Sequence, residues 1–105
     1  MTKYYKGNSM TQKHVKRGIA YEKRKANEHG ASHIGGPGMH DYQRGSVKGE
    51  VKARQTPVTK PELQRLIREK GVREVDSKAG FTQPAIDYRN RHQPGVKLIS
   101  KRKII

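Results

Sequence analysis

Hydrophobic positions near the start of the chain follow helical spacing. Residues 12–29 contain no proline, and their periodic positions recur at steps of four, three and four: Val15, Ile19, Glu22 and Ala26. That spacing places all four side chains on one face of a helix. Glu22 is the acidic member of an otherwise apolar face, so it should point toward the surface on which the helix packs. Residues 1–11 are expected to form a flexible basic leader.

Two more helices are predicted downstream. At residues 59–70, Thr59 and Glu62 match the capping-box pattern, an apolar face follows, and Gly71 is the expected stop. A third helix, opened by a threonine, is predicted over residues 82–90. Short apolar runs predict three strands: residues 31–34, 72–77 and 96–100. The last five residues, KRKII, are expected to be a basic tail with an apolar tip.

Residues 47–54 alternate between apolar or small positions and charged ones, which predicts a strand with one apolar face. The Gly45-Ser46 pair before it is typical of a two-residue hairpin turn. Counting back across that turn gives four facing pairs: Arg44 with Val47, Gln43 with Lys48, Tyr42 with Gly49, and Asp41 with Glu50. Two carboxylates should therefore face each other across the hairpin.

Directly opposed carboxylates about 5 Å apart repel each other and cost stability. Two ways of offsetting this cost are open at this point. Lys52 lies on the same strand face as Glu50 and can neutralise one charge, or a divalent cation can be held by both carboxylates. Glu22 has the same two interpretations, since it can pair with a nearby Lys or Arg or join Asp41 and Glu50 around a metal.

The predicted elements occur in the order α-β-β-β-α-β-α-β, which indicates an α/β fold with a mixed central sheet flanked by helices. The chain has 105 residues, so we expect a single domain over residues 12–105. Leu, Ile, Val and Phe together number only 18, a proportion typical of disordered chains when charge is high. Dimerisation, a bound metal or bound nucleic acid would each help by stabilising the folded form.

Charge points to the class of partner. The chain carries 24 Lys and Arg against 9 Asp and Glu, a formal charge of +15, which favours a polyanion such as nucleic acid. A membrane surface is the weaker candidate because no long apolar run is present. The absence of cysteine excludes disulfides and thiolate metal sites. Together with the lack of a signal-peptide pattern, this agrees with a cytoplasmic protein.

Basic residues on the first helix and around the hairpin are candidates for contacts with phosphate. They are Lys16, Arg17, Lys23, Arg24, Arg44, Lys48 and Arg54. Their affinity for DNA should be sensitive to salt. The five histidines show no metal-ligand spacing and are expected in loops or on the surface: His14, His29, His33, His40 and His92.

In its ordered context, this set of residues resembles the PD-(D/E)xK nuclease core. Glu22 on the first helix is followed by the Gly-rich GGPGMH segment, Asp41, a hairpin and then Glu50-Val51-Lys52. The pattern is similar to that of archaeal Holliday-junction resolvases, and residues 75–100 are similar to the end of the catalytic domain of Mrr-type restriction endonucleases. Together the two resemblances cover residues 18–100.

The resemblance implies a restriction-endonuclease-like core and a magnesium-dependent DNA endonuclease, with manganese able to substitute. Asp41 and Glu50 would bind the metal, with the carbonyl of Val51 as a third ligand. Lys52 would orient the attacking water and help deprotonate it, and Glu22 would complete the coordination shell. A four-way junction cut by a homodimer is the expected substrate, since two-fold symmetry suits paired cuts.

Two alternatives remain open. One is a restriction or repair nuclease that acts on ordinary duplex DNA. The other is a small basic nucleic-acid-binding protein without catalysis, which would explain the charge and the small core but not the placement of the acids.

Overall fold

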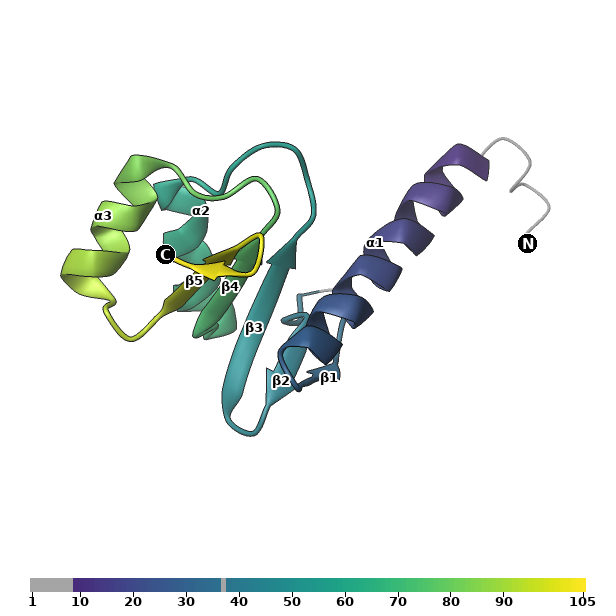
Figure 1. Ribbon diagram of the computed structural model, residues 1–105, viewed down its shortest axis with the longest axis horizontal. Helices are drawn as coiled ribbons and strands as arrows, with labels where there is room; N and C mark the ends of the chain where they lie inside the picture. The colour runs from purple at the N-terminus through teal and green to yellow at the C-terminus, as the bar shows by residue number, and fades with distance from the viewer. Residues whose placement is uncertain (1–8, 37) are drawn as a thin grey trace.

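The computed structural model describes residues 9–36 and 38–105, with side chains from residue 18 onward (Figure 1). The helical elements are α1 (Ser9–Glu28), α2 (Lys60–Arg65), the π-helix η2 (Leu66–Lys70) and α3 (Gln83–His92). The strands are β1 (Ser32–His33), β2 (Tyr42–Arg44), β3 (Val47–Lys52), β4 (Glu74–Ser77), β5 (Lys97–Ser100) and β6 (Lys103–Ile104). The predicted α/β class and mixed sheet are confirmed.

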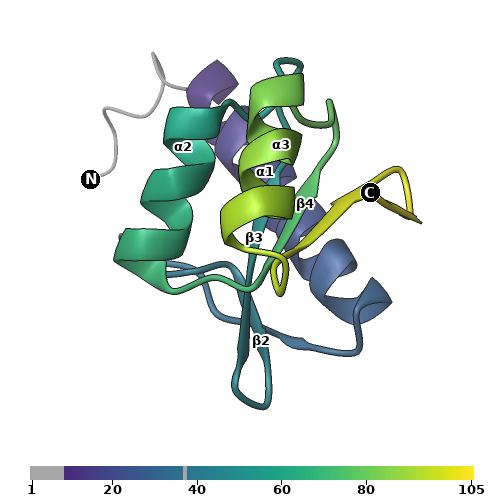
Figure 2. The same cartoon turned by 90° about the vertical axis from the view of Figure 1, so that its left-hand side faces the viewer.

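The six strands form one sheet in sequence order, β1-β2-β3-β4-β5-β6. Strands β1, β2 and β3 are antiparallel neighbours, β3, β4 and β5 run parallel, and β6 returns antiparallel to β5. Helices α2 and α3 lie side by side on one face, and α1 lies on the opposite side of the sheet (Figures 1 and 2).

The main hydrophobic core lies between the sheet and the pair α2 and α3. It contains eight buried residues: Val58, Leu63, Leu66, Val72, Val75, Ala85, Val96 and Leu98. A second, smaller cluster joins α1 to the sheet through Ala26, Tyr42 and Val51. Burial of these aliphatic side chains stabilises the fold, because each is worth roughly 1.5–3 kcal/mol when removed fully from water.

The β2–β3 hairpin has the register predicted from the turn. Tyr42 faces Gly49, and two further pairs on the turn side also match the prediction. The pairing needs glycine at position 49, since a Cβ there would lie 2.1 Å from the ring of Tyr42. Tyr42 is therefore packed against the bare backbone of its partner strand, where it is fully buried.

The predicted helix over residues 59–70 consists of α2 followed by η2, and Gly71 ends it with a φ of 68° as expected. The capping box is only half correct. The side chain of Thr59 makes no cap hydrogen bond, although the pKa of Glu62 is lowered, chiefly by its hydrogen bond with Arg54 and to a small extent by the backbone at Thr59. On α3 the prediction holds, because the hydroxyl of Thr82 accepts a hydrogen bond from the amide of Ala85 at 3.4 Å.

The end of the chain differs from the prediction of a tail. Residues Lys103 and Ile104 form β6, which pairs with β5. The connecting turn consists of Lys101 and Arg102, both with positive φ, so no glycine marks it in the sequence. Over residues 9–36 and 38–105, the structure contains no helix with the length and apolar character needed to cross a membrane.

Candidate active site at the β2–β3 hairpin

Asp41 and Glu50 lie together at the open end of the β2–β3 hairpin. Asp41 immediately precedes β2, and its backbone amide donates to the carbonyl of Gly49 at 2.9 Å. Its carboxylate Oδ2 accepts a hydrogen bond from the backbone amide of Val51 at 2.7 Å. The register of the hairpin ends at Tyr42 and Gly49, so the predicted direct pairing of Asp41 with Glu50 stays a prediction, while the bond to Val51 places the Asp41 carboxylate beside the residue that follows Glu50.

Glu50 is almost fully buried and is bound by two lysines. Oε2 lies 3.2 Å from Nζ of Lys52 and 3.1 Å from Nζ of Lys70. The other oxygen, Oε1, is buried and has no hydrogen-bond partner within the described residues. A buried carboxylate oxygen without a partner is costly, so this atom, like Oδ1 of Asp76, is available to a ligand.

Lys70 was not among the predicted site residues. It is the last residue of η2 and reaches Glu50 from a separate element. Spacing alone gives no sign of it, because Lys70 follows Glu50 by twenty residues and lies at the end of an ordinary helical pattern.

The environment of Asp41 disfavours its ionised form. Burial raises the pKa of Asp41 from its ordinary value of 3.8 to about 6, and the negative charges of Glu50 and Glu22 add to this rise. The hydrogen bond from Val51 and the positive charge of Lys70 act in the opposite direction. A carboxylate under such repulsion is stabilised by a cation close to it.

Glu22 acts on this site from a distance. Its Oε1 lies 3.0 Å from Nε2 of His33, and its side chain is 26 % exposed. Glu22 therefore has a protein partner in β1, although its charge still affects the pKa of Asp41. Within residues 9–36 and 38–105, no group of three Asp, Glu, His or Cys side chains is close enough together to hold a metal ion.

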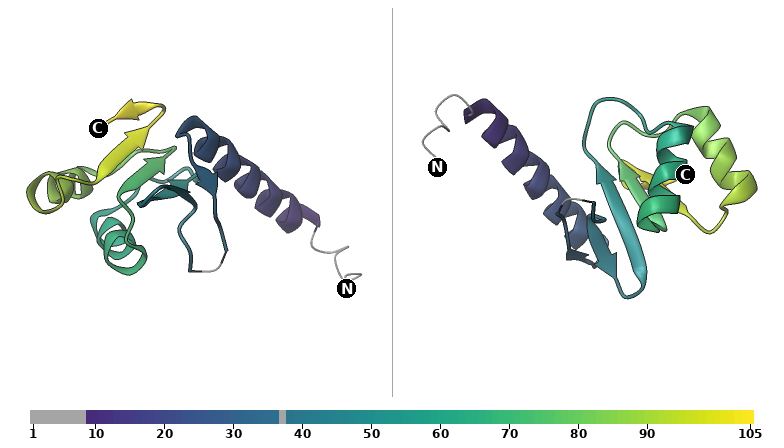
Figure 3. Two further views of the ribbon diagram at one scale, coloured as in Figure 1. Left: turned by 90° about the horizontal axis from the view of Figure 1, so that it is seen from below. Right: turned by 180° about the vertical axis from the view of Figure 1, so that it is seen from behind.

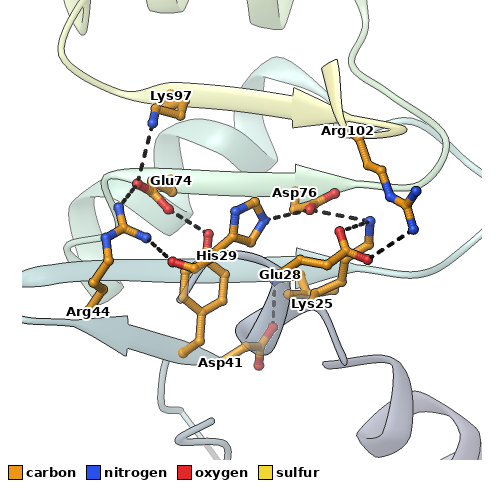
Figure 4. Close-up of polar contacts among 11 residues, drawn as sticks. Lys25, Glu28, His29, Asp41, Arg44, Glu74, Asp76, Lys97 and Arg102 are labelled. Carbon is orange, nitrogen blue, oxygen red and sulfur yellow. Dashed lines mark hydrogen bonds and ion pairs between the residues drawn. The ribbon is translucent and has the colours of Figure 1, made fainter. Parts of the chain in front are cut away.

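A second set of buried charges lies on the α1 side of the sheet, which the sequence did not indicate (Figure 4). Glu74 accepts a hydrogen bond from the hydroxyl of Tyr42 at 2.8 Å and forms an ion pair with Arg44. Burial alone would raise the pKa of Glu74. The hydrogen bonds from Arg44 and Tyr42 outweigh burial and hold this pKa below its ordinary value. This group fixes β2 to β4, and both carboxylate oxygens of Glu74 have partners: Oε1 accepts from Tyr42 and Oε2 from Arg44.

Asp76 is the other buried carboxylate on that side. Its Oδ2 lies 2.8 Å from Nε2 of His29 and 3.6 Å from Nζ of Lys25, both on or just after α1. His29 also stacks on Tyr42, with ring centroids 5.2 Å apart. These contacts attach the end of α1 to the sheet.

Of the histidines expected in loops or on the surface, His29 and His40 lie in loops and His92 is exposed, whereas His33 lies in β1 and is half-buried. His29 is half-buried in the contacts just described, and His40 is buried with a hydrogen bond to Gln43 at 2.7 Å. His29 is held by Asp76, which is distant in sequence, and His40 by Gln43, three residues away. Spacing rules for metal ligands do not detect such partners.

The predicted DNA-contacting residues separate into four groups. Lys23 and Arg24 are exposed on α1, and Lys48 is half-buried on β3. Arg44 and Arg54 are held in ion pairs, the first with Glu74 and the second with Glu62. Lys16 and Arg17 belong to α1, but their side chains lie outside the described residues. The exposed pair on α1 is therefore the best placed for phosphate contacts.

The donor set suits a hard divalent cation in part. Asp41 and Glu50 supply carboxylate oxygens, and Oε1 of Glu50 is unpartnered within the described residues, so two ligands of the kind that magnesium prefers are adjacent. Comparison of the chain with protein-family models, with curated proteins and with solved structures finds no match.

Proposed function

We propose that the protein is a metal-dependent DNA endonuclease with its active site at Asp41, Glu50 and Lys52. The observation that carries this proposal is the buried, unpartnered Oε1 of Glu50, located beside a second carboxylate whose pKa is raised. An unpartnered buried oxygen also occurs at the ion-paired Asp76, so it is the combination of such an oxygen with a neighbouring carboxyl of raised pKa that favours a ligand at this site. A bound divalent cation would resolve them together, because it satisfies the free oxygen and the repulsion at once.

In the proposed mechanism, Asp41 and Glu50 hold the cation, with the Val51 carbonyl as an expected third ligand. A bound magnesium ion would supply an activated water and stabilise the charge on the scissile phosphate. Lys52, whose ammonium lies 3.2 Å from Glu50, would donate a hydrogen bond that orients the attacking water, and the lowered pKa of that water on the ion would release its proton to solvent. Glu22, whose carboxylate is paired with His33 at 3.0 Å, would take part through water.

Substrate recognition in this proposal relies on charge and symmetry. The net charge of +15 suits a polyanionic substrate, and the exposed Lys23 and Arg24 lie on the helix that carries Glu22. We include in the proposal the restriction-endonuclease-like fold that the resemblance implies. A four-way junction cut by a homodimer is the proposed form of the reaction.

Nicking assays on a four-way junction and on a linear duplex of equal length, with magnesium or manganese, test this function. Asp41→Asn, Glu50→Gln and Lys52→Met should each lower the rate at least a hundredfold. Asp87→Asn and Glu69→Gln remove the same charges from exposed positions and should leave the rate unchanged. Equal activity in all five variants would contradict the proposal. Preference for the junction separates a resolvase from a restriction or repair nuclease.

A second candidate function is non-catalytic binding of nucleic acid. Two lysines already neutralise Glu50, as expected of a purely structural ion pair that needs no metal. This arrangement favours the second function. Calorimetry with manganese distinguishes the two functions. A binding protein without catalysis should show no saturable site for the ion that is lost in Asp41→Asn.

A further inference from the structure

Two ammonium groups share one oxygen of Glu50. Lys52 and Lys70 both contact Oε2, at 3.2 Å and 3.1 Å, while Oε1 stays without a partner within the described residues. Lys52 is two residues from Glu50 on the same strand, so its position follows from the strand itself. Lys70 comes from η2, and its contact has to be explained by the geometry of that element.

The π-helical turn places Lys70 at the site. Residues 66–70 form the π-helix, and Gly71 ends it in the left-handed conformation, with its amide bonded to the carbonyl of Ile67 at 3.1 Å. π-Helical turns are rare and occur frequently at functional sites. Leu66 and Val72, both buried, fix the two ends of this segment in the main core.

Two lysines already offset much of the negative charge at the site. Asp41 and Glu50 supply two negative charges, with Glu62 3.9 Å from Lys52, and Lys52 and Lys70 supply two positive ones, with both lysine side chains only about a quarter exposed. A divalent cation added to this group brings an excess of positive charge into a partly buried place. Phosphates of bound DNA would remove that excess.

We propose that Lys70 makes metal binding dependent on DNA: its ammonium holds Glu50 in the free protein and transfers to a phosphate oxygen when DNA and metal bind together. This inference rests on the proposed function of the same site. Lys70 is then a residue that contacts the substrate, and its removal should change the coupling between the two ligands. Because such coupling is reciprocal, metal should tighten DNA binding by the same factor.

Calorimetry with Ca²⁺ as the probe ion, with and without a DNA junction, tests the proposal through binding alone. In the wild type, DNA should raise the affinity for Ca²⁺ by about tenfold or more. Lys70→Met should bind Ca²⁺ about tenfold more tightly than the wild type in the absence of DNA, and DNA should then add less than threefold. Arg68→Met removes an exposed charge from the same turn and should behave as the wild type. Lys70→Arg keeps the charge and should retain the coupling.

Each outcome bears on one of the two proposals. If the wild type binds Ca²⁺ and Lys70→Met shows the same affinities and coupling, the role of Lys70 is wrong while the proposed function stands. If the wild type binds no Ca²⁺ with or without DNA, the proposed function fails and the role of Lys70 fails with it. Should Lys70→Met not fold, Lys70→Gln, which keeps a polar end, gives the same comparison.

Discussion

The backbone amide of Val51 donates to the carboxylate of Asp41 at 2.7 Å, across the open end of the β2–β3 hairpin. This bond keeps a buried acid in place beside a second one, although burial and the charge of Glu50 raise its pKa to about 6. Ionising Asp41 therefore requires more free energy in the folded protein than in the unfolded chain.

Asp41→Asn should stabilise the metal-free protein in a pH-dependent way. The folded protein holds the proton of Asp41 more tightly than the unfolded chain, so the wild type loses stability as pH rises from about 4 to about 6. Above that range the variant should be more stable by about 2 kcal/mol, allowing for partial solvent screening. Urea unfolding in a chelator at pH 4.5 and pH 8 measures this difference. An equal difference at both pH values would show that the ionisation of Asp41 is not its cause.

Gly49→Ala should be strongly destabilising, since its Cβ would lie 2.1 Å from the Tyr42 ring. We expect a loss of about 3 kcal/mol or more, because strand backbone and a buried ring must both shift. Gly18→Ala is the matched control. A Cβ at Gly18 meets nothing within 4 Å, and alanine should raise stability by roughly 0.5–1 kcal/mol inside a helix. Thermal unfolding of both variants checks the pair, and similar melting temperatures would contradict the packing.

Tyr42→Phe should lower stability without affecting the proposed chemistry. The phenol donates to Glu74 at 2.8 Å, and both groups are buried. Loss of the donor leaves a carboxylate oxygen less well satisfied, at a cost of about 1–3 kcal/mol. Tyr88→Phe, which removes a hydroxyl from a half-buried ring on α3, should cost less than about 0.5 kcal/mol. Equal unfolding free energies for the two variants would show that the Glu74 contact contributes little.

The hairpin register was predictable because its determinants are local: a Gly-Ser turn and strict alternation on the following strand. The roles of Glu74 and Asp76 were not, since their partners Arg44 and Lys25 come from distant elements. The position of an acidic residue within a strand does not predict which basic side chain will pair with it in the fold. Similarly, nothing local in residues 66–70 marks the π-helical turn that brings Lys70 to Glu50.

Basic residues should differ in what they contribute. Lys23→Ala removes an exposed charge from α1 and should reduce the slope of log K against log salt for DNA binding by about one, with folding stability unchanged. Arg44→Ala instead leaves Glu74 buried with a partner missing and should destabilise the fold by about 3 kcal/mol. Fluorescence anisotropy across a salt series, combined with urea unfolding, separates the two effects. A changed salt slope in a fully stable Arg44→Ala would contradict this assignment.

Helix α1 extends well beyond the sheet, so that only its later turns contact β1 and β2 (Figures 1 and 3). An isolated helical segment of about 12 residues or fewer is marginal in water, and the early turns of α1 project away from the sheet (Figure 1). The helical content of these turns should therefore report on binding. When a polyanion lies along them, the negative far-ultraviolet ellipticity of the protein should increase in proportion to the fraction bound.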